Sequence, residues 1–333
     1  FGTGIGILEH SHRGKALDRV MAEAEADCRA IAGIPDNYRI LFLQGGASTQ
    51  FFQIPMNFLK PGASADYVVT GVWSKKAIKE PKLFGGARTV ASSEDKNFSY
   101  IPALKPEMFS ADAAYCHYTS NNTIFGTQFR GVPPCPGGVP LICDASSDIF
   151  SRPIDVSKHA LIYAGAQKNL GPAGCALLIM RDDLIERGAE GIPTMMQYRT
   201  HAAEDSRYNT PNSFAIYLMG RVFKWILGSG GLEGMESINE QKASALYDFV
   251  DASPFYRATV SDPGSRSRMN ICFRCEREDL EAGFIEQAER AGLRNLKGHR
   301  SVGGMRASIY NAVSLDSVRA LIEFMKEFER ANG

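Results

Sequence analysis

Two charged side chains lie where buried strands are expected to end. Asp144 follows the apolar run that begins at residue 140, and Lys168 follows the next apolar run, residues 159–165. Ligands of open α/β sheets collect at the carboxyl ends of strands, so both side chains could reach one crevice. An amine that is desolvated there has a lowered pKa and becomes a nucleophile toward carbonyl groups, while a carboxylate can hold a positively charged ring nitrogen.

A glycine-containing loop follows the first predicted strand. In LFLQGGASTQFF, residues 41–52, Gly45 and Gly46 precede small and hydroxylated residues that open a helix. Free N–H groups and the positive end of the helix dipole suit a phosphate, with the hydroxyls of Ser48 and Thr49 as further donors. An ordinary capped turn explains the same residues, and the loop lacks the Gly-Lys-Ser/Thr ending of a nucleotide P-loop.

These three features together match the needs of one cofactor. Pyridoxal 5′-phosphate (PLP) requires a cradle for its phosphate, an acid for its pyridinium nitrogen and a lysine for its aldehyde. Each feature alone has a plain alternative, since Asp144 could equally be a helix cap or a turn residue. The combination predicts a PLP site that contains Lys168, Asp144 and the loop at 45–48.

The elements around these residues predict an α/β domain with a mostly parallel seven-stranded sheet. Apolar runs without period-two alternation, separated by helices or loops, are typical of parallel strands that are covered on both faces. A first helix begins near Gly14 and closes at Gly33 and Pro35. Its core positions are expected to be Leu17, Val20, Met21, Ala24, Cys28 and Ile31. We expect strands at 39–44, 66–71, 88–92, 113–119, 140–146, 159–165 and 175–180, and a helix near 74–84.

The pattern changes after about residue 212. Two helices, at 212–231 and 232–251, lead into a segment that alternates strand, helix, strand and helix, at 268–275, 279–292, 306–311 and 314–332. This order is typical of a smaller α+β domain. A chain of 333 residues also exceeds the length at which a single core stops growing. We therefore expect a large α/β domain at 1–228 and a small α+β domain at 229–333.

Charge and apolar content exclude several classes of partner. Lys and Arg together number 37, as do Asp and Glu, so the formal net charge is zero. No long basic run offers a footprint for nucleic acid or an anionic membrane. The apolar runs are far shorter than the ~20 residues that span a bilayer. A small-molecule partner is the remaining expectation.

The seven cysteines are odd in number and scattered along the chain. This pattern does not suit a disulfide framework, and no secretory segment opens the sequence, so we expect a cytoplasmic protein. Cys272 and Cys275 form a C-x-x-C, but they lie on a predicted strand, where positions three apart face opposite sides. We expect no metal site.

Seven segments of the chain match a known pattern. They are SHRGK, NYRILFLQGG, ADYVVTGVWSKKAIKE, SRPIDVSKHALIYAGAQKNLGPAG, YNTP, SRMNICF and LKGHRSVGGMRASIYNA. Together they resemble the phosphoserine aminotransferase family, which belongs to the class V aminotransferases of PLP fold type I. The resemblance extends from about Gly2 to Gly333, and GAQKN together with KGHRSVGG is its most specific part.

The resemblance implies roles for the residues that would hold PLP. Lys168 would bind the cofactor as a Schiff base and move the proton between the substrate α-carbon and the cofactor. Asp144 would pair with the ring nitrogen, Trp73 would stack on the ring and Thr123 would bond near its hydroxyl. The residues implied around the phosphate are Ala47, Ser48 and Gln167, with Asn209 and Thr210 from the partner subunit of a homodimer that shares its active sites.

The resemblance also implies the substrates. They are phosphoserine, glutamate and their oxo acids, so one site must accept two anions of similar length. Arg306 would grip the α-carboxylate, and two histidine–arginine pairs would grip the distal phosphate or carboxylate: His12 with Arg13, and His299 with Arg300. Two departures from the family pattern stand out. The family usually opens with an N-F-S-A-G-P segment that this chain does not show, and some relatives have an arginine in place of Ser48.

Two rival functions use the same fold. A cysteine desulfurase would need a nucleophilic cysteine on a mobile loop after the lysine. Cys272 and Cys275 lie on a predicted strand, and Cys135 precedes Lys168. A non-catalytic scaffold would have lost the lysine or the aspartate, and both are present. The expected function is the one that the resemblance implies: reversible transamination between L-phosphoserine with 2-oxoglutarate and 3-phosphohydroxypyruvate with L-glutamate, in serine biosynthesis.

Overall fold

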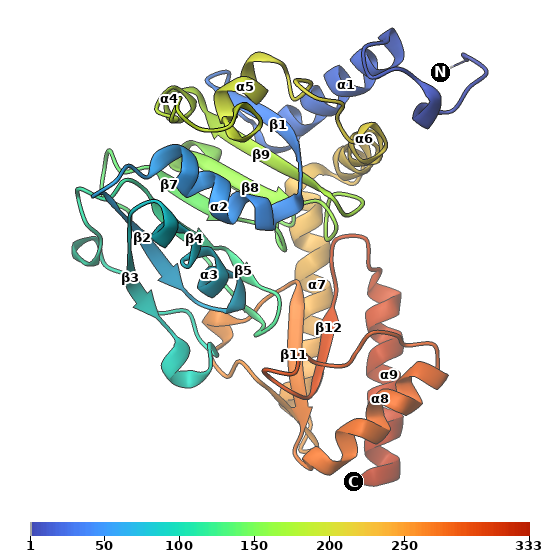
Figure 1. Ribbon diagram of the computed structural model, residues 1–333. Helices are drawn as coiled ribbons and strands as arrows, with labels where there is room; N and C mark the ends of the chain where they lie inside the picture. Colours follow the sequence, from blue (N-terminus) through green and yellow to red (C-terminus); the bar gives the residue numbers. More distant parts are fainter. Residues whose placement is uncertain (1) are drawn as a thin grey trace.

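The computed structural model describes residues 2–333, and its centre is a seven-stranded sheet (Figure 1). The four pairs β8–β7, β7–β4, β4–β2 and β2–β3 are parallel, which confirms a mostly parallel seven-stranded sheet. Across the sheet the order is β1 (Tyr38–Gln44), β9 (Cys175–Arg181), β8 (Leu161–Gly165), β7 (Leu141–Asp144), β4 (Cys116–Thr119), β2 (Ser64–Val69) and β3 (Gly86–Ser92).

Strand β9 runs antiparallel to both of its neighbours, β1 and β8. Because β8 and β9 are consecutive in the chain, residues 166–174 join them as one connection at the end of β8. Lys168 lies in this connection. The apolar runs had predicted both strands but carried no information on their direction.

Successive residues of the strands contribute to two cores, one on each face of the sheet. On one face, Ile40 and Phe42 pack with helices α1 (Lys15–Ala32) and α6 (Ser213–Gly228). All six residues that helical spacing had placed in the core of α1 are buried. The other face, which includes Leu41 and Leu43, packs against α2 (Gly46–Phe58), α3 (Val72–Ala77), α4 (Asp182–Glu186) and α5 (Tyr198–Ala203).

The helix expected near 74–84 is shorter than predicted. Helix α3 ends at Ala77, and a separate 3₁₀ turn covers Glu80–Leu83. Pro81 lies in that turn, and proline cannot donate the hydrogen bond that a continuing α-helix requires. Trp73 lies in the first turn of this short helix, shortly after β2.

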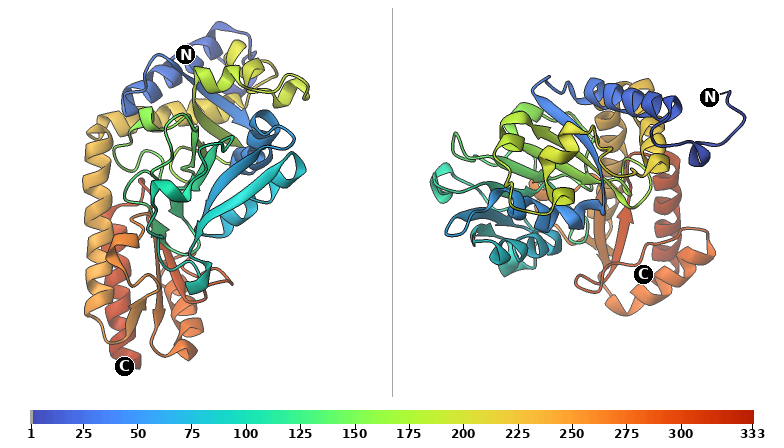
Figure 2. Two further views of the ribbon diagram at one scale, coloured as in Figure 1. Left: turned by 90° about the vertical axis from the view of Figure 1, so that its left-hand side faces the viewer. Right: turned by 45° about the horizontal axis from the view of Figure 1, so that its top comes forward.

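The C-terminal part has its own antiparallel sheet and its own core. Helix α7 (Gly231–Ala252) runs from the large sheet to this small sheet, as two views show (Figures 1 and 2). The short strand β10 (Tyr256–Ala258) was not predicted, nor were the two-residue strands β5 (Asn121–Asn122) and β6 (Thr127–Gln128). The remaining elements are β11 (Asn270–Cys275), α8 (Glu281–Arg290), β12 (Met305–Ser308) and α9 (Leu315–Asn332).

Three features of residues 2–333 bear on the excluded classes. None of their helices is both long enough and apolar enough to cross a membrane. They contain no group of three or more His, Cys, Asp or Glu side chains that could hold a metal ion. All seven cysteines are free thiols, and Cys272 and Cys275 are both buried.

Candidate active site

A cavity of about 260 Å³ lies where the central strands end. This volume is far larger than one water molecule needs, so a small organic molecule can enter. Asp144 comes from the end of β7, Lys168 from the β8–β9 connection and Trp73 from the residues after β2. The lining residues are Gly45, Gly46, Ala47, Ser48, Phe51, Trp73, Thr119, Asn121, Asp144, Ser146, Ser147, Gln167, Lys168, Ala173 and Gly174.

Lys168 has a defined orientation in this cavity. Its Nζ atom donates a hydrogen bond to Thr123 Oγ1 at 2.5 Å and lies 5.8 Å from the centroid of the Trp73 ring. Burial lowers the pKa of Lys168 to about 8, because desolvation disfavours the charged amine; the nearby Arg306 lowers it further, while Asp144 opposes the shift. An amine with this pKa is partly neutral near pH 7 and can therefore act as a nucleophile or base.

Asp144 is buried at the end of β7, and a tight turn holds it. The backbone N–H of Ser146 donates to Asp144 Oδ1 at 3.0 Å. Burial raises the pKa of Asp144, whereas its bonds to Ser146 and the positive charge of Lys168 oppose the rise. A buried carboxylate is stabilised by a cationic partner, so a protonated ring nitrogen in the cavity suits this position.

The glycine loop presents the first turn of α2 to the cavity. Gly45 and Gly46 have φ values of 91° and 65°, a left-handed conformation that glycine adopts without steric cost. Helix α2 spans 13 residues with no acidic residue in its first turn. The N–H groups of a first helical turn have no partner within the helix, so Ala47 and Ser48 offer donors and a positive dipole to an anion.

Two polar atoms beside the cavity test whether a PLP-sized group fits. Trp73 Nε1 and Thr119 Oγ1 are buried and have no hydrogen-bond partner within residues 2–333, and both residues line the cavity. Buried polar atoms in folded proteins are nearly always paired, so these two atoms are available to a polar group bound in the cavity. With the anion-binding turn of α2, the carboxylate of Asp144 and the amine of Lys168, the residues fit PLP.

Arg306 extends the site toward the small sheet. It lies on β12 opposite Cys272 of β11, and its Nε atom is buried without a hydrogen-bond partner within residues 2–333. Its positive charge contributes to the lowered pKa of Lys168, so the two side chains are close enough to interact. An arginine in this place can bind a carboxylate through its planar fork of N–H groups.

Eight predicted site residues do not line this cavity. Two of them, Thr123 and Arg306, adjoin it through Lys168, and the other six lie elsewhere. His12 and Arg13 lie together, with Arg13 Nε donating to His12 Nε2 at 3.3 Å. His12 Nδ1 is 3.4 Å from Thr210 Oγ1, so the histidine also meets the YNTP segment that carries Asn209. His299 and Arg300 belong to the loop between the bridge at Lys297 and strand β12. Within one chain, the structure thus gathers the implied cofactor residues except Asn209 and Thr210, and it leaves the two histidine–arginine pairs apart.

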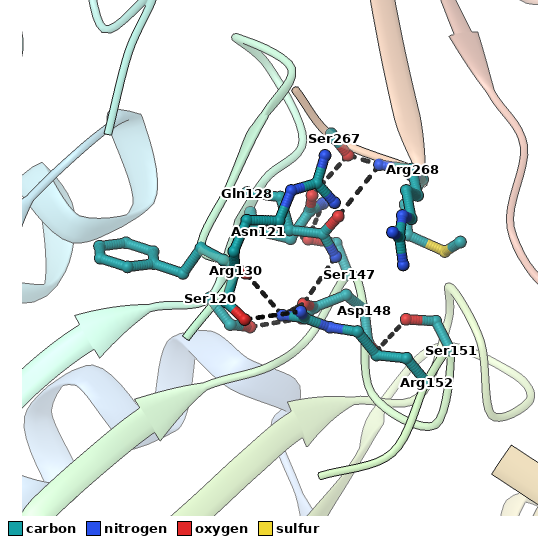
Figure 3. A network of polar contacts seen from close by, with 12 residues as sticks. Ser120, Asn121, Gln128, Arg130, Ser147, Asp148, Ser151, Arg152, Ser267 and Arg268 are labelled. Carbon is teal, nitrogen blue, oxygen red and sulfur yellow. Dashed lines mark hydrogen bonds and ion pairs between the residues drawn. The ribbon is translucent and has the colours of Figure 1, made fainter. Parts of the chain in front are cut away.

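A layer of polar residues beside the cavity was not predicted from the sequence (Figure 3). Asn121, which lines the cavity, donates to Ser147 Oγ at 2.8 Å and accepts from Ser267 Oγ at 2.5 Å. Asp148 accepts hydrogen bonds from Ser120 and from Gln128. The only sequence signal was the density of polar residues directly after two apolar strands, at 120–123 and 144–148.

Tyr310 is a second residue that was missed. Its hydroxyl accepts a hydrogen bond from Asn270 Nδ2 at 3.2 Å. Burial raises the pKa of Tyr310, while hydrogen bonds with Asn270 and Thr123 and the charge of Arg306 oppose the rise. The phenol is therefore close enough to interact with both Arg306 and Thr123, the residue that holds the amine of Lys168.

Comparison with known proteins defines the class and then the family. The family model of the class-V aminotransferases matches residues 3–321. A phosphoserine aminotransferase of Desulfosudis oleivorans is 54% identical over 334 residues, which cover 100% of this chain and 91% of that protein. The solved structure of a phosphoserine aminotransferase from Bacillus circulans subsp. alkalophilus has a TM-score of 0.96 at 51% identity, and the match covers 99% of this chain and 91% of that one.

A PLP-bound phosphoserine aminotransferase from Trichomonas vaginalis has a TM-score of 0.90 at 39% identity, and the match covers 97% of this chain and 92% of that one. The fold is thus that of a class-V aminotransferase of PLP fold type I. The chain belongs to the phosphoserine aminotransferase family.

Proposed function

We propose that this protein is a PLP-dependent aminotransferase that interconverts L-phosphoserine and 2-oxoglutarate with 3-phosphohydroxypyruvate and L-glutamate, as in serine biosynthesis. One observation carries the chemistry: the amine of Lys168 is held at 2.5 Å from Thr123 in a cavity shared with Asp144 and an anion-binding helix turn. Family membership supports the choice of substrates.

The residues of this chain have separate tasks in the reaction. PLP, when bound, supplies an aldehyde for the amino group and a ring that accepts electrons. Asp144 would keep the proton on the ring nitrogen, and the first turn of α2 at Ala47 and Ser48 would bind the phosphate. Lys168, whose pKa is lowered to about 8 by burial, would move the proton at the substrate α-carbon. Trp73 would cover one face of the ring and exclude water there.

The arginines would decide which acids bind. Arg306 would grip the α-carboxylate that every amino donor carries. His12, Arg13, His299 and Arg300 would bind the distal phosphate or carboxylate. Guanidinium groups suit this task because they meet both anions through paired N–H donors, and histidines can adjust their charge near neutral pH.

We also infer a homodimer in which each subunit completes the site of the other. The position of Asn209 and Thr210 outside the cavity of their own chain supports this, because the family resemblance requires them at the phosphate. The seven free cysteines suit a cytoplasmic protein.

The proposed domains are 1–228 and 229–333. The chain leaves α6 at Gly228, and the core around the small sheet consists of residues 243–328. Leu232 and Met235, in the first turns of α7, still pack into the core of the large sheet, so this helix would join the two domains.

The experiment that tests the function is a coupled assay of the wild-type protein with phosphoserine and 2-oxoglutarate. We expect the protein to form glutamate in this assay. With cysteine as the substrate, we expect no release of sulfide. Lys168→Ala should lose both turnover and the visible absorption band of bound PLP. Lys168→Arg is the matched control: it keeps the positive charge but cannot bond covalently to PLP, so it should fail in the same way. Near-normal turnover in either variant would refute the assignment of Lys168.

A further inference from the structure

A strained turn lies just beyond Asp144. Phe150 is buried and has a φ of 54°, a left-handed conformation that is uncommon for a bulky residue. Such a conformation persists only where its surroundings enforce it. The three carbonyl groups of this turn, those of Ile149, Phe150 and Ser151, have no place in a strand or helix and need partners of their own.

Three asparagine side chains bind these three carbonyl groups, one each. Asn169 Nδ2 donates to Ile149 O at 3.1 Å. Asn311 Nδ2 donates to Phe150 O at 2.9 Å, and Asn239 Nδ2 donates to Ser151 O at 2.9 Å. We call Asn169, Asn239 and Asn311 the asparagine cluster.

The cluster is also bonded internally, with Asn311 at its centre. The backbone N–H of Asn311 donates to Asn169 Oδ1 at 3.0 Å, and Asn239 Nδ2 donates to Asn311 Oδ1 at 2.9 Å. All three asparagines are buried. Just before Asn311, the amine of the fully buried Lys242 donates to Ile309 O at 3.0 Å and to Tyr310 O at 2.9 Å. The end of β12 is therefore fixed by side chains from two directions.

The cluster joins the three segments that carry the reacting groups. Asn169 follows Lys168 directly in the sequence, the turn at 149–151 follows Asp144, and Asn311 continues the strand of Arg306. Because β12 belongs to a different sheet from β7 and β8, contacts between the two parts must set the distance between these segments. The asparagine cluster is one such contact, and the bonds of Asn121 to Ser267 and Asn270 are another.

We propose that Asn311 is a positioning residue for transamination, which sets the place of Arg306 relative to Lys168 and Asp144. The proposal rests on the proposed function, since it assigns the α-carboxylate to Arg306. Asn311 does not line the cavity, so its effect passes through the elements that it joins.

The expected effect follows from geometry. A displacement of about 1 Å between a bound substrate and a catalytic group can lower the rate by about a hundredfold. If β12 shifts, the α-carboxylate site moves relative to the amine of Lys168, so KM rises and kcat falls together for every amino donor. The ratio between phosphoserine and glutamate should stay constant, because both carry the same α-carboxylate.

The decisive variant is Asn311→Asp, which has the same shape and keeps the acceptor for Asn239 but loses the donor to Phe150 O. Asn239→Ala is a milder second variant, since it leaves Asn311 itself in place. Asn57→Ala is the matched control: Asn57 is as buried as Asn311 and donates to Gln53 O at 2.9 Å and Met196 O at 2.8 Å. It lies near the C-terminal end of α2, outside the lining of the cavity.

Steady-state kinetics and absorption spectra of the PLP-loaded variants test the proposal. In Asn311→Asp we expect KM for both donors to rise and kcat to fall, each by about tenfold, at an unchanged donor ratio. The pH midpoint of the visible band should shift, because it reports the surroundings of Lys168. Asn57→Ala should change only the unfolding midpoint. A purely structural role would make Asn311→Asp behave like Asn57→Ala, and that result would overturn the proposal.

The two hypotheses fail in different ways. The proposed function fails if the wild-type protein does not transaminate phosphoserine. The role of Asn311 is measured by comparing KM and kcat of the variant with those of the wild type, for whichever amino donor the wild type accepts. It is also measured by the absorption spectrum, which needs no substrate. It can therefore be refuted whether or not the proposed substrates are right.

Discussion

Arg306 and Arg300 have the same side chain but different surroundings. Arg306 is partly covered on β12, with Nε buried, whereas Arg300 is exposed in the loop before that strand. The first suits a group that every substrate carries at a fixed place, and the second suits a charge that only some substrates extend outward. Under the proposed function, this difference would separate binding of the α-carboxylate from selection of the distal phosphate.

Substitution of these arginines should therefore change specificity in two patterns. Each charged hydrogen bond is worth about 1.5–3 kcal/mol, so Arg300→Ala should lower kcat/KM for phosphoserine by roughly tenfold to a hundredfold while alanine is spared. Arg306→Ala should weaken phosphoserine, glutamate and alanine alike. The check is kcat/KM for the three donors in both variants. Loss of alanine activity in Arg300→Ala, or its survival in Arg306→Ala, would contradict the scheme.

His117 gives the protein a defined sensitivity to acid. It is buried on β4, where its Nε2 is 2.9 Å from the hydroxyl of Tyr163. Burial lowers the pKa of His117 to about 3, because the charged imidazole is desolvated. In the unfolded chain the pKa is about 6.5, so only the unfolded state takes up this proton as the pH falls. The contribution of neutral His117 to the stability of the fold is therefore complete above about pH 6.5, and it is lost progressively as the pH falls to about 3.

The corresponding prediction is a change in the pH dependence of stability. From this residue alone, the free energy of unfolding should fall by about 2 kcal/mol between pH 7 and pH 5. His117→Gln keeps a donor for Tyr163 but does not titrate, so its urea unfolding should depend less on pH by that amount. Parallel pH profiles for the two proteins would show that His117 is protonated in the fold.

At the scale of the element, the glycine loop before α2 depends on space as well as on conformation. A Cβ atom at Gly45 would lie 1.9 Å from Thr49 Oγ1 and 2.9 Å from Thr49 Cβ. Rotation of the threonine can relieve the first contact but not the second. The turn must therefore open if Gly45 is replaced, and the N–H groups at Ala47 and Ser48 would move.

We expect Gly45→Ala to weaken binding of PLP by at least about tenfold, since a charged hydrogen bond is worth about 1.5–3 kcal/mol. Gly62→Ala is the matched control: Gly62 has a similar φ of 83°, but its Cβ would meet nothing within 4 Å among the described residues. Both variants carry the backbone strain, and only Gly45→Ala carries the clash. Equal affinities for PLP, measured by absorbance titration of the apoproteins, would show that the cradle tolerates a side chain.

Long elements with a clear period could be predicted from the sequence. The spacing of apolar residues in α1 identified all six of its buried residues, and Gly33 does end that helix, with a left-handed φ of 54°. The apolar runs likewise identified all seven strands of the large sheet. Among the site residues, Asp144 and Lys168 could be inferred because each follows such a run, and the structure places both on one cavity.

Features that depend on contacts between distant segments could not be predicted. An apolar run carries no information on the direction of its strand, so the antiparallel orientation of β9 could not be predicted. Strand β10 has only three residues, too few for a period. Asn311 and Asn169 are 142 positions apart, and Asn311 and Phe150 are 161 apart. Nothing near any of these residues in the sequence signals that they meet.

At the scale of the whole molecule, mixing inactive variants tests the shared active site. We would combine Lys168→Ala with the double variant Asn209→Ala, Thr210→Ala, and let the subunits exchange. If Asn209 and Thr210 act on the partner, each mixed dimer has one intact site, and random exchange restores about a quarter of wild-type activity. If each chain completes its own site, every site in the mixture is damaged and activity stays absent.

The place of β1 at the edge of the large sheet has a consequence for synthesis of the chain. Among residues 2–333 its only neighbour in that sheet is β9, which pairs with it from Tyr38 opposite Arg181 to Gln44 opposite Cys175. A ribosome that adds about 5–20 residues per second needs on the order of ten seconds between these two strands. During that interval α1 can cover one face of the strand, but its hydrogen-bonding edges have no partner in the sheet, so the strand is exposed to aggregation and is a natural target for chaperones.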